Sequence, residues 1–356
     1  YTWQQGLTIV LLSGIIFLII AVTPLRKKII NQIPKSIKAA ISAGIGLFIA
    51  IIGFLNSGTG IVKLDAANNI TGLQFTLAND AGETVLNSAG LLTIIGVLII
   101  AVLMAWKVKG AIFIGIIATT LIGIPMGVTV LPESFKALIS YDNLTFSTFF
   151  QFDFAGIFDK GILPLVTAVV SFAIVDMFDT VGTLIGTAGS AGMLDEDGNM
   201  EGGDKALIAD AVATCVGACM GTSTVTTYVE SSTGIAEGGR TGLTSLTVGI
   251  LFLLAIVLSP IAGIIPGAAT APALIIVGVL MMRGVKDIDW NDIEVAIPAF
   301  LTITIMPFGY SISDGIGFGF ISYTIIKMCR GKFKEVPILM YIVSALFIAM
   351  YILKNI

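Results

Sequence analysis

The sequence contains no histidine and few charged residues. Among 356 residues there is no histidine, so imidazole is excluded as a metal ligand, a general base or a proton relay, and any acid–base chemistry must use carboxyl groups. Charged residues make up only 12% of the chain, against roughly 25% in soluble domains. The three cysteines cannot all pair with one another, and Cys215 and Cys219 fit the role of small packing residues in an apolar helix. An ordinary soluble domain is therefore excluded.

The composition is instead that of a membrane protein. Hydrophobic residues make up 56% of the chain, and 40 glycines suit close helix packing in a bilayer. The net charge of −4 argues against a nucleic-acid partner. We therefore predict an all-α polytopic protein that spans the cytoplasmic membrane several times, with the lipid bilayer as its surroundings.

Hydrophobic runs mark the expected spans. Runs long enough to cross, or nearly cross, ~30 Å of hydrocarbon lie at residues 7–22, 36–55, 88–106, 110–127, 163–187, 203–220, 243–262, 270–282, 294–308, 312–329 and 336–353. Basic segments at 24–38, 106–110 and 327–334 are expected on the cytoplasmic side.

The sequence also shows an internal similarity. "GLTIVLLSGIIFLIIAVTP" (6–24) resembles "GLTSLTVGILFLLAIVLSP" (242–260) when one residue of slippage is allowed. Two Leu/Ile-rich spans can look alike without a common origin, and that alternative stays open. If the similarity is a repeat, an odd number of crossings between the copies would give them opposite orientations, as in secondary transporters.

Two aspartates stand one turn apart in the run at 163–187. Asp176 and Asp179 would lie about 60° apart around a helix axis, and no Lys or Arg occurs between residues 161 and 194. One charged Asp at a helix centre costs ~2.5–3.5 kcal/mol on insertion scales. Because the span contains no cationic partner, the remaining explanation for the two acids is that they bind a ligand or a coupled proton. A carboxylate can accept parallel hydrogen bonds from the N–H groups of a purine or pyrimidine. Phe178 could stack on such a ring, or face lipid or a neighbouring helix.

A polar stretch interrupts the later spans. "GTSTVTTYVESSTGIAEGGRTG" (221–242) predicts a short strand from Thr222 to Val229 and then a short helix that ends at Gly238-Gly239. Extended backbone at membrane depth needs protein or a cavity around it. Glu230 stands at the junction, where the half-helix would aim its N–H groups into the cavity. A plain extramembrane loop is the alternative.

"VDMFDTVGTL" followed by "GTSTVTTYVESSTGIAEGGRTGLT" closely resembles the AzgA-like guanine/hypoxanthine permeases among the nucleobase–cation symporters. The resemblance implies fourteen segments in two inverted repeats of seven, with short strand-plus-half-helix elements and separate core and gate domains. By that count residues 7–22 correspond to the fourth segment, about 11 of 14 segments are present, and the strand that faces the substrate from the third segment is not in this chain. The implied domains are core 1–35, gate 36–162, core 163–265 with the substrate site, and gate 266–356.

The resemblance also implies the site. The acidic pair matches Asp176 and Asp179, and the acid of the half-helix matches Glu230. We assign substrate binding to Asp176, Glu230, Phe178, Thr227 and Val229, and proton coupling to Asp179, Asp176 and Glu230. The implied activity is proton-coupled uptake of guanine, hypoxanthine and, as a further candidate, adenine. The resemblance implies no metal and no cofactor besides the coupled proton. The expected partner is the purine nucleobase, and the chain could also form a homodimer.

Other functions fit less well. An intramembrane aspartyl protease would place its acids on separate helices in Tyr-Asp and Gly-x-Gly-Asp motifs, and no Gly-x-Gly-Asp occurs here. A same-fold carrier of uracil, xanthine or an inorganic anion is the closer alternative, although Glu230 would repel an anion. No filter sequence indicates a channel. The acidic segment 195–205 lacks the ligand spacing of an EF-hand.

Overall fold

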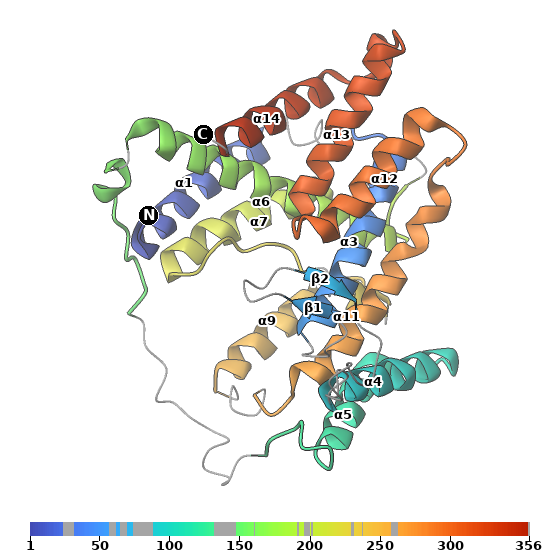
Figure 1. The fold of residues 1–356 in the computed structure, drawn as a ribbon. Helices are drawn as coiled ribbons and strands as arrows, with labels where there is room; N and C mark the ends of the chain where they lie inside the picture. Colours follow the sequence, from blue (N-terminus) through green and yellow to red (C-terminus); the bar gives the residue numbers. More distant parts are fainter. Residues whose placement is uncertain are drawn as a thin grey trace. The chain divides into compact units, whose positions relative to one another are not determined.

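The computed structural model describes residues 1–23, 32–56, 62–64, 70–73, 88–131, 147–159, 161–190, 192–195, 200, 202–228, 231–236, 238–257 and 263–354. Helices dominate this part of the chain (Figure 1). The α-helices are α1 Trp3–Val22, α3 Lys35–Asn56, α4 Ser88–Ala105, α5 Ala111–Gly123, α6 Ile162–Ser190, α7 Gly203–Met220, α8 Ser231–Ala236, α9 Gly242–Val257, α11 Gly267–Met281, α12 Ile293–Phe308, α13 Ile312–Cys329 and α14 Ile338–Lys354. Short 3₁₀ turns are η2 Gly156–Phe158, η3 Met282–Asp287 and η4 Phe333–Glu335.

The predicted spans are confirmed as helices. Each hydrophobic run contains one helix of the described chain, and five helical stretches are long and apolar enough to cross a bilayer by length and composition: Trp3–Val22, Lys35–Leu55, Ser88–Ala105, Pro164–Gly189 and Gly267–Asp287. Residue chemistry fixes several of the helix ends. At the start of α1, Thr2 and Gln5 form a capping box, and Gly221 at φ 91° ends α7.

A small hairpin lies in the polar segment between α3 and α4. Strand β1 (Val62–Leu64) pairs with β2 (Ile70–Leu73) in antiparallel register, with Val62 opposite Leu73. The strand predicted at 222–229 is not found: its described residues, 222–228, form no strand. Its polar groups bond to side chains of α6 and α7 instead, so this segment has no ladder partner among the described residues.

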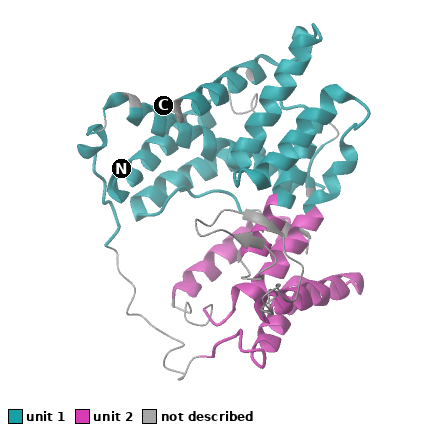
Figure 2. Cartoon of the chain, in the orientation of Figure 1, with its two compact units in different colours: residues 1–47, 145–229, 281–356 teal, residues 48–144, 230–280 magenta. Residues whose placement is uncertain are grey.

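The chain forms two compact units, which Figure 2 colours separately. Unit 1 holds residues 1–47, 145–229 and 281–356, and unit 2 holds residues 48–144 and 230–280. These units are defined by packing and not by motion. The core and gate boundaries inferred from the resemblance therefore stay a prediction.

In unit 1, α1 packs against both α6 and α7, and α13 packs against α6, α12 and α14. Close contact depends on small residues: a Cβ at Gly14 of α1 would lie 3.0 Å from Thr214 of α7. In unit 2, α4 packs on α5, and the Thr93 hydroxyl donates to the Ala268 carbonyl of α11 at 3.1 Å. Helices α6 and α7 are thereby held by α1 and α13, and they carry the acids described below.

One ion cluster joins α12 to the end of α13. The Glu294 carboxylate, with 8% of its side chain exposed, contacts the side-chain nitrogens of Lys327 at 2.8 Å, Arg330 at 2.9 Å and Lys332 at 2.7 Å. A buried carboxylate needs such partners, because an unpaired buried charge is strongly destabilising. We call Glu294, Lys327, Arg330 and Lys332 the α12–α13 clasp.

Candidate functional site

Asp176 lies in the middle of α6 and faces α7. It is buried, with 3% of the residue exposed, and its Oδ2 accepts a hydrogen bond from the Thr214 hydroxyl at 3.2 Å. Its Oδ1 is also buried and has no hydrogen-bond partner among the described residues. Buried polar atoms nearly always have a partner, and exceptions call for a functional explanation. This oxygen is therefore the clearest candidate for contact with a ligand or a proton.

Asp179, one turn later on α6, faces a different neighbour. Its carboxyl group lies close to the backbone N–H of Ser313, at the start of α13. Its Oδ1 is buried and, like that of Asp176, has no partner within the described chain. The two acids of the sequence motif thus contact α7 and α13 respectively.

A third buried acid, Asp210 on α7, was not among the predicted site residues. Asp210 is 7% exposed, and its two oxygens accept from the hydroxyls of Thr180 at 2.7 Å and Thr227 at 3.0 Å. It is near enough to Asp176 to repel its charge. A signal was present in the sequence, because Asp210 also stands inside a predicted span, 203–220, whose one base, Lys205, lies more than a helical turn before it.

The segment 222–228 runs along α6 and α7 and completes this acidic site. The Thr214 hydroxyl accepts from the Val225 N–H at 3.3 Å and lies 2.9 Å from the Val225 carbonyl. The Thr226 hydroxyl lies 3.4 Å from that of Thr180, and Thr227 binds Asp210 as described. The predicted residue Thr227 is therefore brought to the acids, through Asp210 and not through Asp176.

The structure places Phe178 in a packed aromatic cluster. It is 1% exposed, and its ring lies edge-on to Phe320 of α13, with centroids 5.7 Å apart, and 5.4 Å from the ring of Phe347 of α14. The sequence allowed Phe178 either to stack on a substrate ring or to face lipid or a neighbouring helix, and in the structure it faces neighbouring helices. The structure does not bring Phe178 together with the acids.

Val229 and Glu230 lie outside the described residues. The short helix predicted after them is present as α8, Ser231–Ala236, and Gly238 adopts φ 110° where the sequence predicts its end. Their roles stay predictions.

Charge determines what this site can bind. Among the described residues, Asp176, Asp179 and Asp210 form no ion pair. Asp176 and Asp210 accept hydrogen bonds from threonine hydroxyls, and the buried Oδ1 atoms of Asp176 and Asp179 present acceptors to a ligand. Such a site suits a neutral molecule with N–H donors, and a carboxyl group can also take up a proton.

Comparison with known proteins assigns the chain to a family. Residues 2–318 match the xanthine/uracil permease profile, which is described as "Permease family". The chain belongs to this permease family. It is 43% identical to the guanine/hypoxanthine permease PbuO of Bacillus subtilis over 99% of this chain and 78% of that protein. It is 37% identical to the adenine permease AdeP of Escherichia coli, over 97% and 74% of the two chains.

The fold also matches solved membrane transporters. The transmembrane domain of the cyanobacterial bicarbonate transporter BicA aligns with a TM-score of 0.55 at 17% identity, over 89% of this chain and 76% of that chain. SLC26A9 aligns with a TM-score of 0.52 at 13% identity, over 92% and 51%. The protein is thus a multi-pass membrane permease of this transporter fold, and not an enzyme.

Proposed function

We propose that this permease imports purine nucleobases, guanine and hypoxanthine first and adenine as a further candidate, together with protons. The observation that carries the proposal is the buried Oδ1 of Asp176, which has no partner among the described residues and stands beside Asp210 and Thr214. Two adjacent N–H donors on a purine edge match a carboxylate acceptor. The names of the permeases PbuO and AdeP support the substrate class.

The proton role is proposed for the same acids. Two unpaired carboxyl groups close together in a bilayer repel each other, so a proton bound at one of them relieves both repulsion and desolvation. We propose Asp179 and Asp176 as the groups that take up this proton. Substrate contact at Thr227, Val229 and Glu230 is retained as part of the proposal.

An inorganic anion is the other substrate class open to this fold, since BicA is described as a bicarbonate transporter. Carboxylates without a described cationic partner would repel such a substrate. Uracil and xanthine remain competitors within the neutral heterocycles, and uptake competition among guanine, hypoxanthine, adenine, xanthine and uracil ranks them.

The test is Asp176→Asn in the full-length protein. This change keeps the shape of the side chain but removes its charge and replaces one acceptor by a donor. Because a hydrogen bond to a charged group contributes up to about 3 kcal/mol, we expect uptake of labelled hypoxanthine to fall by about 100-fold. Guanine binding, measured by thermal shift, should fall as well if Asp176 contacts the base.

Asp289→Asn is the matched control. Asp289 is exposed, and its contact is a local one in which its Oδ1 accepts from the Asn291 N–H at 3.0 Å. Uptake by this variant should equal that of the wild type. Normal uptake by Asp176→Asn, with equal protein in the membrane, would refute the role of Asp176.

A further inference from the structure

At the interface of α6 and α13, Asp179 lies beside a second acid that the proposed function does not use. The Asp179 carboxyl group is close to the Ser313 N–H and near enough to Asp314, in the first turn of α13, for the two charges to repel each other. The Oδ1 atom of Asp179 is buried and has no hydrogen-bond partner among the described residues. A buried polar atom without a partner calls for an explanation. We call Asp179 and Asp314 the α6–α13 acid pair.

Tight packing of α6 on α13 brings the pair together. The ring of Phe178 lies edge-on to that of Phe320, with centroids 5.7 Å apart. One turn later on α6, a Cβ at Gly182 would lie 3.0 Å from the Ile316 side chain. These contacts stand on either side of the α6 acid in the sequence, so the first turns of α13 are held against it. The closeness of the two acids therefore follows from the packing of two helices.

Asp314 links this interface to the exposed turn between α12 and α13. Asp314 is partly exposed, whereas the preceding Ser313 is only 1% exposed. A Cβ at Gly309, an exposed residue of the turn, would lie 4.0 Å from the Cβ of Asp314. The Ser311 and Ser313 hydroxyls lie 3.1 Å apart. The start of α13 is therefore a polar segment that connects an exposed turn with Asp179.

This turn lies at the end of α12 and α13 that is opposite the α12–α13 clasp. The clasp joins the start of α12 to the end of α13, so the turn that connects these helices lies at their other ends. The basic segment 327–334 predicts that the clasp is on the cytoplasmic side. The turn is then directed away from the cytoplasm, which is the side from which an importer takes its proton.

An acid in the first turn of a helix has an ordinary structural role. The Ser311 hydroxyl accepts from the Asp314 N–H at 3.1 Å, and a carboxylate at this position interacts favourably with the helix dipole. That role requires no second acid on a neighbouring helix, and the charge of Asp179 opposes it. Helix capping therefore explains an acid at residue 314, but it does not explain the pairing of that acid with Asp179.

The titratable groups that face the pair are acids and a phenol. Asp176 of α6 itself repels Asp179, and Asp210 of α7 lies beside Asp176. From α14, the Tyr351 hydroxyl lies 3.4 Å from the Asp314 carbonyl. Within the described chain, neither acid of the pair forms an ion pair.

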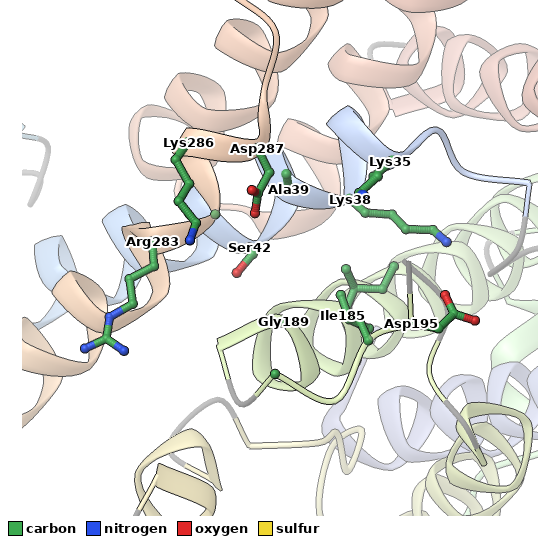
Figure 3. Close-up of a pocket in the computed structure, with 13 residues that line it drawn as sticks. Lys35, Lys38, Ala39, Ser42, Ile185, Gly189, Asp195, Arg283, Lys286 and Asp287 are labelled. Atoms are coloured by element: carbon green, nitrogen blue, oxygen red, sulfur yellow. The ribbon is translucent and has the colours of Figure 1, made fainter. Parts of the chain in front are cut away.

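The other elements that pack on α6 are α1, η2 and η3. Helix α1 and the turn η2 contain no charged residue. The turn η3 contains three, which line a cavity beside Ile185 and Gly189 of α6, more than one helical turn beyond Asp179 (Figure 3): Arg283, Lys286 and Asp287. A bound proton is therefore the available means of offsetting the repulsion within the pair.

We propose that Asp314 passes protons between the α12–α13 turn and Asp179 during import. This inference rests on the proposed function, because it requires uptake to be coupled to protons. In the transfer, the O–H bond of protonated Asp314 breaks as an O–H bond forms at a carboxylate oxygen of Asp179, directly or through one water molecule. Asp314 is left as a carboxylate, which takes its next proton from water at the turn. A proton shared by the two acids also relieves their repulsion.

The experiment separates proton transfer from substrate binding. Full-length protein is reconstituted in proteoliposomes, and uptake of labelled hypoxanthine is driven by an inward proton gradient. A second assay measures the exchange of external labelled for internal unlabelled hypoxanthine without a gradient, which requires no net proton movement. We expect gradient-driven uptake by Asp314→Asn to fall by at least about tenfold, while exchange stays within about twofold of the wild-type rate. A pH-sensitive dye inside the vesicles reports whether an inward hypoxanthine gradient acidifies the interior.

Two further variants distinguish proton transfer from a structural role. Asp314→Glu keeps a carboxyl group at this position and should retain gradient-driven uptake. Asp292→Asn is the matched control, because Asp292 is an exposed acid at the start of α12, and its Oδ1 accepts from the Glu294 N–H at 3.0 Å. Uptake and exchange by this control should both equal those of the wild type.

The failure of this inference can be told apart from that of the proposed function. If the wild type does not carry hypoxanthine, or carries it without acidifying the interior, the proposed function fails and this inference fails with it. If the wild type does acidify the interior, three results overturn the role of Asp314 alone. These are normal gradient-driven uptake by Asp314→Asn, an equal loss of uptake and exchange in that variant, and a loss of gradient-driven uptake in Asp314→Glu as large as that in Asp314→Asn.

Discussion

Single carboxyl groups on α6 and α7 differ in how many of their oxygens are occupied. Both oxygens of Asp210 accept threonine hydroxyls, at 2.7 and 3.0 Å, whereas Asp176 has one oxygen bonded and Asp179 has a buried Oδ1 without a described partner. A fully bonded acid holds its neighbours in position, and a partly bonded one remains open to a ligand. We therefore infer that Asp210 positions α6 and segment 222–228 around Asp176.

The pair Thr180 and Asp210 provides a test of this positioning. Thr180→Val removes the hydroxyl but keeps the shape, and a buried acceptor that loses its donor costs about 1–3 kcal/mol. We expect a lower unfolding midpoint and weaker uptake. In an Asp210→Asn background the same change should cost less, with a coupling energy of about 0.5 kcal/mol or more. Additive effects on the midpoint would contradict a direct bond.

The aromatic residue between the acids gives a second test at this scale. Phe178→Leu should lower stability by roughly 1–2 kcal/mol, because each aromatic contact contributes about 0.5–1.5 kcal/mol beyond area. The KM for hypoxanthine should stay unchanged, since Phe178 packs on Phe320 and Phe347. A marked rise in KM with normal stability would instead support stacking on the base.

Sequence reasoning found part of this site and missed part for physical reasons. Asp176 and Asp179 are conspicuous because an apolar run without cations surrounds them. Asp210 follows the acidic segment 195–205, so its carboxyl is less conspicuous, and only the fold shows it beside Asp176. The direction in which Phe178 points depends on how α13 and α14 pack, which no local pattern contains.

At the scale of elements, hydrophobic runs located the helices because long apolar stretches in a bilayer must satisfy their backbone groups internally. The strand predicted at 222–229 was not fixed by such a requirement. A strand needs a partner ladder, and in the described residues Val225 bonds to the Thr214 hydroxyl of α7 instead. The sequence pattern indicated an extended backbone, but strand pairing is a tertiary property.

Helix packing gives a prediction at Gly315 of α13. A methyl group there would overlap the Met306 side chain and lie 2.9 Å from the Thr302 carbonyl and 3.0 Å from the Met306 nitrogen. Because backbone atoms cannot move aside, Gly315→Ala should push α13 away from α12 and lower stability by roughly 1–3 kcal/mol. Thermal unfolding of the purified protein measures this change.

Gly249 of α9 is the matched control, because a Cβ there meets nothing within 4 Å. Gly249→Ala should leave stability unchanged or raise it by about 0.5–1 kcal/mol through helix propensity. If both substitutions were equally harmless, the close approach of α12 and α13 would have no energetic role.

At the scale of the whole molecule, transport requires a defined orientation in the membrane, and the fold alone does not determine it. The basic segment 327–334 predicts that the end of α13 is cytoplasmic. Cys329, the last residue of α13, is an exposed free thiol and reports on this directly.

In a Cys215→Ala/Cys219→Ala background, a membrane-impermeant maleimide should label Cys329 in inside-out vesicles and not in right-side-out vesicles. Cys329→Ser in the same background should abolish the labelling and identifies the reacting site. Labelling from the outer side would reverse the orientation of every span assigned here.

The α12–α13 clasp has a consequence for how the protein tolerates change. Three bases serve one acid, so when any single base is exchanged for a neutral residue, two cations still neutralise Glu294. Exchange of Glu294 itself would leave three positive charges close together, of which Lys327 alone still contacts an acid in the described residues, Glu335 at 2.9 Å. Tolerance of mutation is therefore one-sided here: any one of Lys327, Arg330 and Lys332 can be replaced, whereas Glu294, which all three contact, cannot.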